Sequence, residues 1–345
     1  MRIGKLTLGL LATGLSPWLI NCALKFPASF DSHLSNSGTA TGSRACANAV
    51  ASDILSMVCI PANTTGFTMD DTNLFLTHTV ASITAFAMAK YEVQYGDWLT
   101  VYSWATGGNG YSFANPGVQG DNGARTNQHP VTNVNWRDTI IWCNAASQKA
   151  GLAPVYYSDA GFTTVLKASS AATAVIGSAG SGSVDFPFVN LSANGYRLPT
   201  EAEWEYVARY VDGTTFKPGN YASGATAIYS TFAGSDLVAW FGNIVNGSTG
   251  NTVTTQPVGT KAANALGIYD MSGNVTEWVW DWNTSYTTAP PYTDADSQGS
   301  TSGTVRIQRG GSWVNTALYL QTSQRPSNSP WNTGNFVGFR PVRRP

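Results

Sequence analysis

The segment YRLPTEAEWEY, residues 196–206, fixes one helix and the packing around it. Thr200 precedes Glu203 by three positions, so each side chain can accept a hydrogen bond from the other residue's free backbone N–H. This capping box predicts a helix that begins after Thr200. Trp204 and Val207 then fall on one face of that helix, three positions apart, and are expected to point into the core.

A second helix is predicted upstream of this segment. Asn135 can cap a helix that begins at Trp136, and Asp138 places a negative charge in its first turn, where the helix dipole favours it. Gly151 is expected to end the helix. A further helical stretch is indicated at residues 95–102, because aromatic and aliphatic side chains recur there at helical spacing.

The rest of the chain predicts few regular elements and long loops. Residues 58–67 are read as a pair of strands broken by Pro61 and Gly66. The glycine-rich stretch 107–123 and the small-residue stretch 168–183 are expected to be surface loops. After Val211 there are short apolar segments but no long helical pattern. The predicted fold class is therefore α+β.

Composition narrows the class of partner. The chain has 345 residues, of which 11% are charged, and it contains 12 Trp and 35 Gly. This suits an ordered, loop-rich domain with a large core. The net charge is −1, so binding to nucleic acid is not expected. After Asp296 the only charged residues are scattered arginines, two of which lie in the terminal motifs described below.

The amino-terminal residues indicate export. Arg2 and Lys5 precede an apolar run that is too short and interrupted to span a membrane but suits a signal peptide, predicted at 1–21. Cys22 follows directly, as in bacterial lipoproteins, where this cysteine is acylated; ordinary cleavage with loss of Cys22 is the alternative. A flexible lipid-anchored tether is predicted for residues 22–50 and a single domain for residues 51–345.

Three cysteines remain after Cys22. A disulfide between Cys46 and Cys59 is one alternative in an exported protein, and unpaired thiols are the other. No CxxC spacing indicates zinc or redox chemistry. Cys143 lies on the apolar side of the helix predicted after Asn135 and is expected to be a buried, inert thiol.

The last forty residues combine two short motifs with an irregular segment between them. RGGSW opens the segment at 309–313 and GFR closes it at 338–340. Between the motifs, Asn, Ser and Thr mix with Tyr319, Trp331 and Phe336 without helical or strand periodicity. Tyr and Trp beside small polar residues are typical of adaptable binding surfaces such as antibody loops. A long, partly buried loop is the alternative interpretation.

Several motifs together resemble those of the formylglycine-generating-enzyme (sulfatase-modifying factor) family. They are MVCIPA at 57–62, YEV at 91–93, HPVTNVNW at 129–136, YRLPTEAEWEY at 196–206, GIYDMSGNVTEW at 267–278, and the two terminal motifs. Order and spacing match over nearly the whole of the chain after the tether. The resemblance implies a C-type lectin-like fold.

The resemblance does not imply the enzymatic activity. Active relatives carry a copper-binding cysteine pair, of which the first member lies two positions after the aromatic of the RGGS motif and the second five positions later. In this chain those positions are Asn315 and Leu320. Neither side chain replaces a thiolate as a soft metal ligand and nucleophile. A non-enzymatic protein is expected, with a copper-dependent oxidase that uses other residues as one alternative.

The chain is also similar to the variable proteins of diversity-generating retroelements of the treponemal kind, in which adenines are mutated near the 3′ end of the gene. That similarity implies a variable region at about 306–345, displayed at the surface of the outer membrane to bind a variant-specific protein or surface glycan. An invariant structural envelope lipoprotein is the other alternative. The residues expected to bind the ligand are Val314, Asn315, Thr316, Leu318, Tyr319, Gln321, Gln324, Pro326, Ser327, Asn328, Ser329, Trp331, Thr333 and Phe336.

No cofactor is expected, and calcium bound by Asn274 and Glu277 is the alternative. Asn274 and Glu277 carry oxygen ligands of the kind that calcium prefers, and relatives hold calcium nearby. Alternatively, Glu277 pairs with Arg309 or Arg340. Ser312 is expected to bond the backbone. The alternating tryptophans at 278, 280 and 282 are expected to pack in the core rather than to form a platform for sugars.

Overall fold

The computed structural model describes residues 46, 53–71, 76–121, 125–169, 181–242, 250–284 and 301–345, which belong to one compact unit. The predicted signal peptide at 1–21, Cys22 and the tether at 22–50, apart from Cys46, lie outside these residues. Most of the surface loop predicted at 168–183 also lies outside them. No helix among the described residues is both long and apolar enough to cross a membrane.

The predicted helices form where their caps place them. Asn135 accepts a hydrogen bond from the Asp138 N–H, and Thr200 accepts one from the Glu203 N–H; both sites are complete capping boxes. The helix indicated at 95–102 is also present and runs four residues further. The helices are α2 (Tyr95–Thr106), α3 (Trp136–Lys149), α4 (Glu201–Arg209), α5 (Phe232–Asp236) and the 3₁₀ helix η1 (Ala317–Leu320).

Short strands form several small sheets. The four-stranded sheet has the order β11 (Ser327–Asn328), β10 (Arg306–Arg309), β9 (Thr276–Trp282) and β12 (Val337–Phe339). The three-stranded sheet has the order β1 (Met57–Ile60), β4 (Phe86–Ala89) and β13 (Val342–Arg343). Three pairs complete the set: β2 (Phe67–Asp71) with β3 (Leu76–Val80), β5 (Val118–Gln119) with β6 (Val131–Thr132), and β7 (Tyr156–Tyr157) with β8 (Phe188–Val189). The α+β class and the C-type lectin-like fold are confirmed.

Strands form at both ends of the stretch 58–67, but they do not pair with each other as expected. β1 pairs with β4, and β2 pairs with β3. Gly66 adopts a φ of 79°, and a Cβ at this position would lie 2.6 Å from the Val80 carbonyl oxygen. The chain therefore turns at Gly66 into the β2–β3 hairpin instead of folding back on β1.

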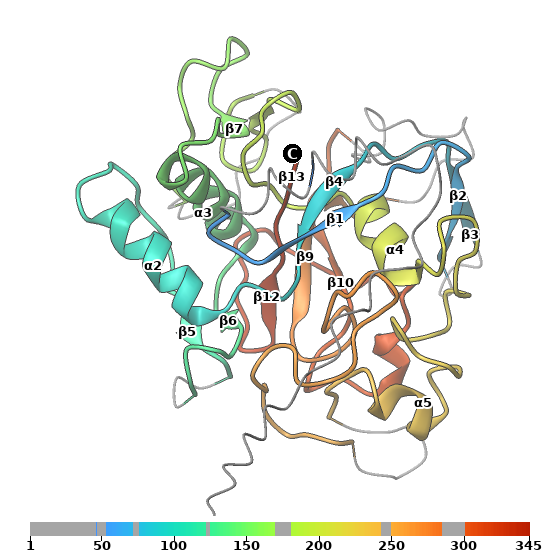
Figure 1. The fold of residues 1–345 in the computed structure, drawn as a ribbon. Coiled ribbons are helices and arrows are strands. Elements are labelled where there is room, and N and C mark those ends of the chain that lie inside the picture. The colour runs from blue at the N-terminus through green and yellow to red at the C-terminus, as the bar shows by residue number, and fades with distance from the viewer. Residues whose placement is uncertain are drawn as a thin grey trace, which may run out of the picture. The chain divides into compact units, whose positions relative to one another are not determined.

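The core is built on tryptophans. Trp98 and Trp142 stack with centroids 6.1 Å apart, and Phe339 of β12 packs edge-on against both. Trp278 and Trp282 of β9 are buried, and Trp280 is half-buried against the main core, so the prediction of core packing is confirmed. In Figure 1, β9 and β12 lie between α2 and α3 on one side and α4 on the other.

The structure decides between the alternatives for Cys46 and Cys59 and confirms the prediction for Cys143. Cys46 and Cys59 form a disulfide, which ties the start of the described domain to β1. Cys143 is free and fully buried on α3. Burial raises the pKa of the Cys143 thiol, so the thiol stays protonated and unreactive.

Candidate functional site

The arginines of the two terminal motifs are fully buried and bonded to carboxylates. Arg309 is 0% exposed and donates to Glu205 of α4 and to the carbonyl of Gln324. Arg340 is also 0% exposed and donates to Glu277 of β9 at 2.7 Å. Of the two partners weighed for Glu277, the structure selects Arg340. A buried ion pair of this kind tolerates no loss of either partner, because the remaining charge would lie unpaired in the core.

Arg306 holds the start of the carboxyl-terminal segment, residues 306–345, in a different way. Its guanidinium carbon lies 3.7 Å from the ring centroid of Trp136 and 3.5 Å from that of Trp282. One amino group also donates to the carbonyl oxygen of Asp185 at 2.6 Å. The cation is thus held between two indole faces, a geometry that strengthens in the absence of water.

Helix α4 also fixes the middle of the segment. Arg325 donates to the two carboxylate oxygens of Glu201 at 2.6 and 2.9 Å. Glu201 and Glu205 lie four residues apart, on the same face of α4. The capping box therefore starts a helix whose carboxylates hold Arg309, at the start of the irregular stretch, and Arg325, in its middle.

Asn274 and Glu277 are engaged in internal bonds. Asn274 donates to Glu92 at 2.6 Å and accepts from the Gln256 N–H at 2.9 Å. Glu277 accepts from Trp204 Nε1 at 2.7 Å in addition to Arg340. Burial, followed by the nearby carboxylates of Asp270 and Glu277, raises the pKa of Glu92 well above its ordinary value. Within the described residues, no three His, Cys, Asp or Glu side chains are grouped so as to hold a metal.

Most of the residues expected to bind a ligand reach the surface. Val314, Leu318, Tyr319 and Trp331 are 38–40% exposed, and Thr333 is exposed as well. The half-exposed members are Asn315, Thr316, Pro326, Ser327, Asn328, Ser329 and Phe336. These twelve side chains lie between the buried arginines along the chain, so the structure separates exposed positions from anchors.

Gln321 and Gln324 depart from that pattern, since each is only 4% exposed. Gln321 donates to the Leu318 carbonyl at 2.9 Å. The residues between the two glutamines are also bound to an earlier part of the chain, because the Thr322 N–H donates to the Tyr221 carbonyl. Both glutamines support the turn after η1 and do not present a side chain to a ligand.

The first half of the segment forms a tight turn. Gly311 has a φ of 68°, and a Cβ there would lie 2.6 Å from the Tyr319 carbonyl oxygen, so the motif requires glycine. Ser312 donates to the Asn315 side chain at 2.8 Å, not to the backbone as expected. Since η1 buries Ala317, three positions before Leu320, the residues between them face outward.

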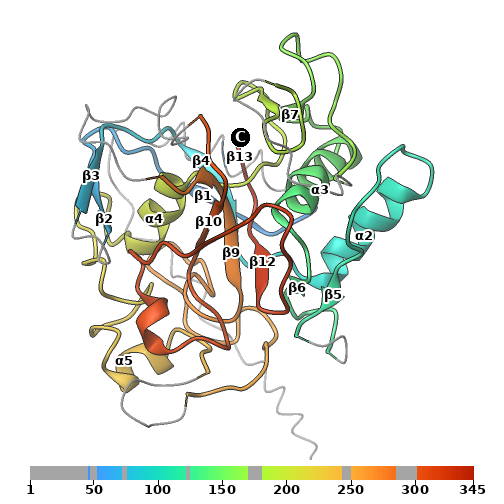
Figure 2. The same ribbon diagram turned by 180° about the vertical axis from the view of Figure 1, so that it is seen from behind.

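The second half lies against α3. The ring of Trp331 covers Arg137, with 5.5 Å between the guanidinium carbon and the ring centroid. The Asn133 N–H donates to the Gly334 carbonyl at 3.0 Å, and Phe336 packs partly into the main core. In Figure 2 the chain between β10 and β12 runs from the side of α5 to the side of α3.

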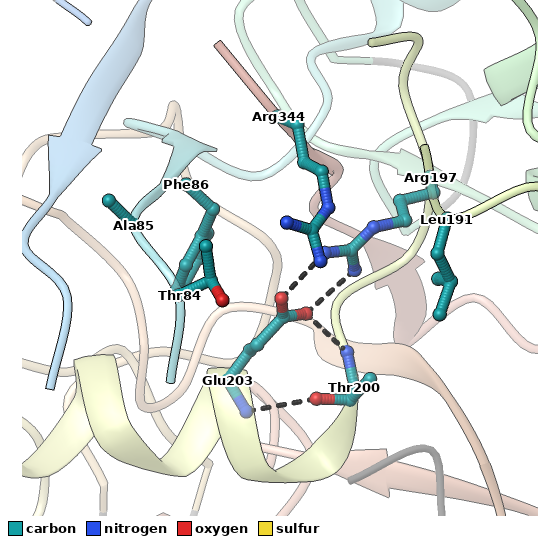
Figure 3. A pocket seen from close by; sticks show the side chains of 8 residues that line it. All are labelled: Thr84, Ala85, Phe86, Leu191, Arg197, Thr200, Glu203 and Arg344. Carbon is teal, nitrogen blue, oxygen red and sulfur yellow. Dashed lines mark hydrogen bonds and ion pairs between the residues drawn. The ribbon is translucent and has the colours of Figure 1, made fainter. Parts of the chain in front are cut away.

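A cavity of about 10 Å³ lies at the capping box of α4, apart from the exposed residues above. Figure 3 shows Glu203 pointing toward Arg197, to which it is bonded at 2.6 and 2.7 Å, with Arg344 beside them. The space suffices for about one water molecule. It is too small to be the main ligand site.

Comparison with known proteins agrees with this architecture. Residues 44–345 match the Sulfatase-modifying factor enzyme 1-like domain. The chain is 32% identical over 279 residues to "Chaperone protein LppX" of Paenibacillus barcinonensis, covering 76% of this chain and 81% of the relative. It is 34% identical over 163 residues to the formylglycine-generating enzyme of Thermomonospora curvata, covering 42% of this chain and 48% of that enzyme.

Among solved structures, Treponema denticola variable protein 1 matches with a TM-score of 0.62 and 31% identity. The match covers 84% of this chain and 95% of the other. A structure titled CarF matches with a TM-score of 0.60 and 26% identity, covering 84% and 98% of the two chains. The chain belongs to the sulfatase-modifying factor enzyme 1-like family, and it resembles the treponemal variable protein expected from the sequence.

Proposed function

We propose that this member of the sulfatase-modifying factor enzyme 1-like family is a ligand-binding lipoprotein displayed outside the cytoplasm. Its variable region at about 306–345 supplies the binding face, and a retroelement diversifies that face to change specificity. The mechanism is recognition without chemistry. The twelve exposed or half-exposed residues contact the ligand, while Gln321 and Gln324 belong to the support.

One observation carries this proposal: buried anchors alternate with exposed residues in a single segment. Arg309 and Arg340 are completely buried and ion-paired, whereas Tyr319 and Trp331 between them are about 40% exposed. A segment fixed at its ends and in its middle keeps its backbone when the exposed side chains change. Diversification of those side chains then alters the ligand without unfolding the domain.

The exposed residues have the chemistry of an adaptable face. Tyr319 and Trp331 offer rigid apolar area at low conformational cost, as in antibody loops. Asn315, Asn328 and Ser329 lie half-exposed beside them and can adapt their hydrogen bonds to different ligands. Large anchors surrounded by small polar groups are typical of binding hot spots.

The residues at the catalytic positions of the family support a non-enzymatic role. Leu320 is fully buried in the apolar cluster beneath η1, and Asn315 accepts a hydrogen bond from Ser312. The free thiol found among the described residues, Cys143, is buried on α3. No thiolate lies where the family's oxidation of a substrate cysteine would take place.

Chaperone activity is a second candidate, because the long match to LppX concerns a protein named as a chaperone. Such a role would also require binding of another protein without chemistry. The two roles differ in the carboxyl-terminal segment: a chaperone for one client keeps its surface residues fixed, whereas a diversified receptor exchanges them among sibling cells.

Selection from a displayed random-peptide library tests the proposed binding face. Peptides would be selected on the intact wild-type chain and measured against a Leu318→Ser/Tyr319→Ser/Trp331→Ser variant. Binding should be lost while the melting temperature changes by only a few degrees, as for surface substitutions in general. Peptides that bind the variant unchanged, or a variant that no longer folds, would contradict the proposal.

A further inference from the structure

Exposed apolar side chains lie on or next to α5 and η1, and some of them are outside the variable region. Three of them precede the variable region: Ile228 is 39% exposed, Phe232 42% and Leu237 62%. Three belong to the variable region: Val314, Leu318 and Tyr319 are 38–40% exposed. We call these six residues the α5–η1 patch. Large exposed apolar groups that cluster mark interaction surfaces, whereas scattered ones need no explanation.

The packing beneath the patch places its two halves together. Val238 and Phe241, which follow α5, share one buried apolar cluster with Ala317 and Leu320 of η1. The Phe232 ring lies 6.0 Å from the ring of Phe241. Figures 1 and 2 both show η1, the short red helix, beside α5. Since each element buries its inner side in the common cluster, the exposed side chains face outward from neighbouring elements.

The backbone confirms this neighbourhood at the start of the variable region. The Gly242 N–H donates to the Asn315 carbonyl at 3.0 Å. A Cβ at Gly242 would lie 2.4 Å from the Trp313 carbonyl oxygen. The chain that follows α5 therefore runs directly against the turn that carries Val314.

The patch carries no net charge. Asp236 at the end of α5 pairs with Lys261 at 3.3 Å. No Asp, Glu or Lys follows Asp296 in the sequence, and Arg309 is buried beneath the segment. The matching partner surface is thus also uncharged and apolar. A glycan fits poorly, because four of the six side chains are aliphatic and offer no hydrogen bonds to hydroxyl groups that would lose water on binding.

We propose that the α5–η1 patch binds an uncharged, apolar area on a protein partner, with Ile228, Phe232 and Leu237 as an invariant half of the binding face. This inference rests on the proposed function and names the class of its partner. The invariant half contributes affinity to every variant of the protein. The variable residues Val314, Leu318 and Tyr319 then decide which apolar protein surface is bound.

The test uses the peptides selected above and a Phe232→Ser/Leu237→Ser variant of the full chain. Leu99→Ser is the matched control, since Leu99 is 39% exposed on α2, which lies apart from α5 in both views. The double substitution should weaken peptide binding on the order of tenfold or more. The control should leave binding unchanged, and all variants should melt within a few degrees of the wild type.

The outcomes separate the two proposals. Peptides rich in charged residues, or peptides insensitive to the Phe232→Ser/Leu237→Ser substitution but sensitive to Leu318→Ser, would overturn the invariant half and leave the proposed function intact. Peptides insensitive to both sets of substitutions, or no peptide recovered above background, would overturn both. Binding by a panel of neutral glycans that depends on Phe232 and Leu237 would overturn the assignment of a protein partner.

Discussion

At the scale of single residues, Arg340 and Tyr319 lie in the same segment but differ completely in environment. Arg340 is fully buried against Glu277, and its removal leaves a carboxylate unpaired in the core. Arg340→Ala is expected to lower the free energy of unfolding by about 3–5 kcal/mol. Tyr319→Ala, at an exposed position, should lower it by less than about 1 kcal/mol. Urea denaturation at neutral pH measures both.

The comparison is informative because both substitutions remove large side chains from residues only 21 positions apart. Equal losses for the two variants would mean that Tyr319 also belongs to the core. A small loss for Arg340→Ala would mean that the Glu277 carboxylate finds another partner, and the distinction between anchor and displayed residue would fail.

Asp270 predicts a dependence of stability on pH. Burial raises the pKa of its carboxyl from 3.8 to about 6, although the Gly259 N–H and Arg340 oppose the shift. The folded state therefore binds a proton at a higher pH than the unfolded chain. The cost of the buried charge is fully present above about pH 6 and disappears as pH falls below the unfolded value of 3.8.

Asp270→Asn removes this titration and keeps a side-chain oxygen for the Gly259 N–H. Asparagine also tolerates the residue's φ of 56°. The stability of the variant relative to the wild type should fall by roughly 1–3 kcal/mol between pH 7 and pH 4. Denaturation curves at several pH values measure the difference; a difference that does not change with pH would refute the assignment.

Not every residue-scale assignment was available from the sequence. The sequence left Arg309 and Arg340 as equal partners for Glu277. Strand register alone does not decide it, because β10 places Arg309 directly opposite Glu277. The choice depends on α4, whose Glu205 binds Arg309, while Arg340 binds Glu277. The burial of Gln321 and Gln324 depends on contacts with the chain near Tyr221, about a hundred residues earlier. Such long-range contacts leave no local pattern.

At the scale of elements, the capping box of α4 has consequences beyond the helix itself. Thr200 accepts from the Glu203 N–H at 3.1 Å, and α4 then carries the carboxylates that bind Arg309 and Arg325. Thr200→Ala should lower the free energy of unfolding by about 1 kcal/mol, with a range of 0.5–2. Thermal denaturation measures the change. Thr200→Ser, which keeps the hydroxyl, is the control, and its free energy of unfolding should fall much less. Equal losses would mean that packing of the Thr200 methyl group, not the cap, stabilises the helix.

Elements with strong local signals were predictable, and elements stabilised only by distant partners were not. The helices after Asn135 and Thr200 carry caps and helical periodicity within a few residues. Most strands are too short to show alternation, and β1 pairs with β4, which begins 26 positions after β1 ends. Helix α5 has five residues and no side-chain cap, so no local sequence pattern predicted it.

At the scale of the whole molecule, the proposed anchor gives a separate prediction. If Cys22 is acylated, cells supplied with radiolabelled palmitate should label the wild-type protein and not Cys22→Ala. The variant should also leave the membrane fraction, because stable membrane attachment depends on the acyl chains. Cys143→Ala is the control, since that thiol is buried and should not affect labelling. Labelling of Cys22→Ala would contradict the anchor.

The fold as a whole was predictable because the motifs occur in the family's order throughout the chain. The binding face was predictable only in part. The variable region followed from the resemblance, but the proposed role of Phe232 and Leu237 did not. That proposal depends on the packing of Val238 and Phe241 against η1, and no spacing in the sequence indicates this contact.

We propose that diversification acts on exposed positions of a segment that buried arginines hold in place. Sequencing the last forty codons and the flanking DNA of this gene in many sibling cells tests it most directly. Substitutions are expected at positions such as Leu318, Tyr319 and Trp331, beside a template repeat and a reverse-transcriptase gene. Arg309 and Arg340 should remain constant. An identical 3′ end in all cells, or substitutions that fall equally on the buried arginines, would contradict it.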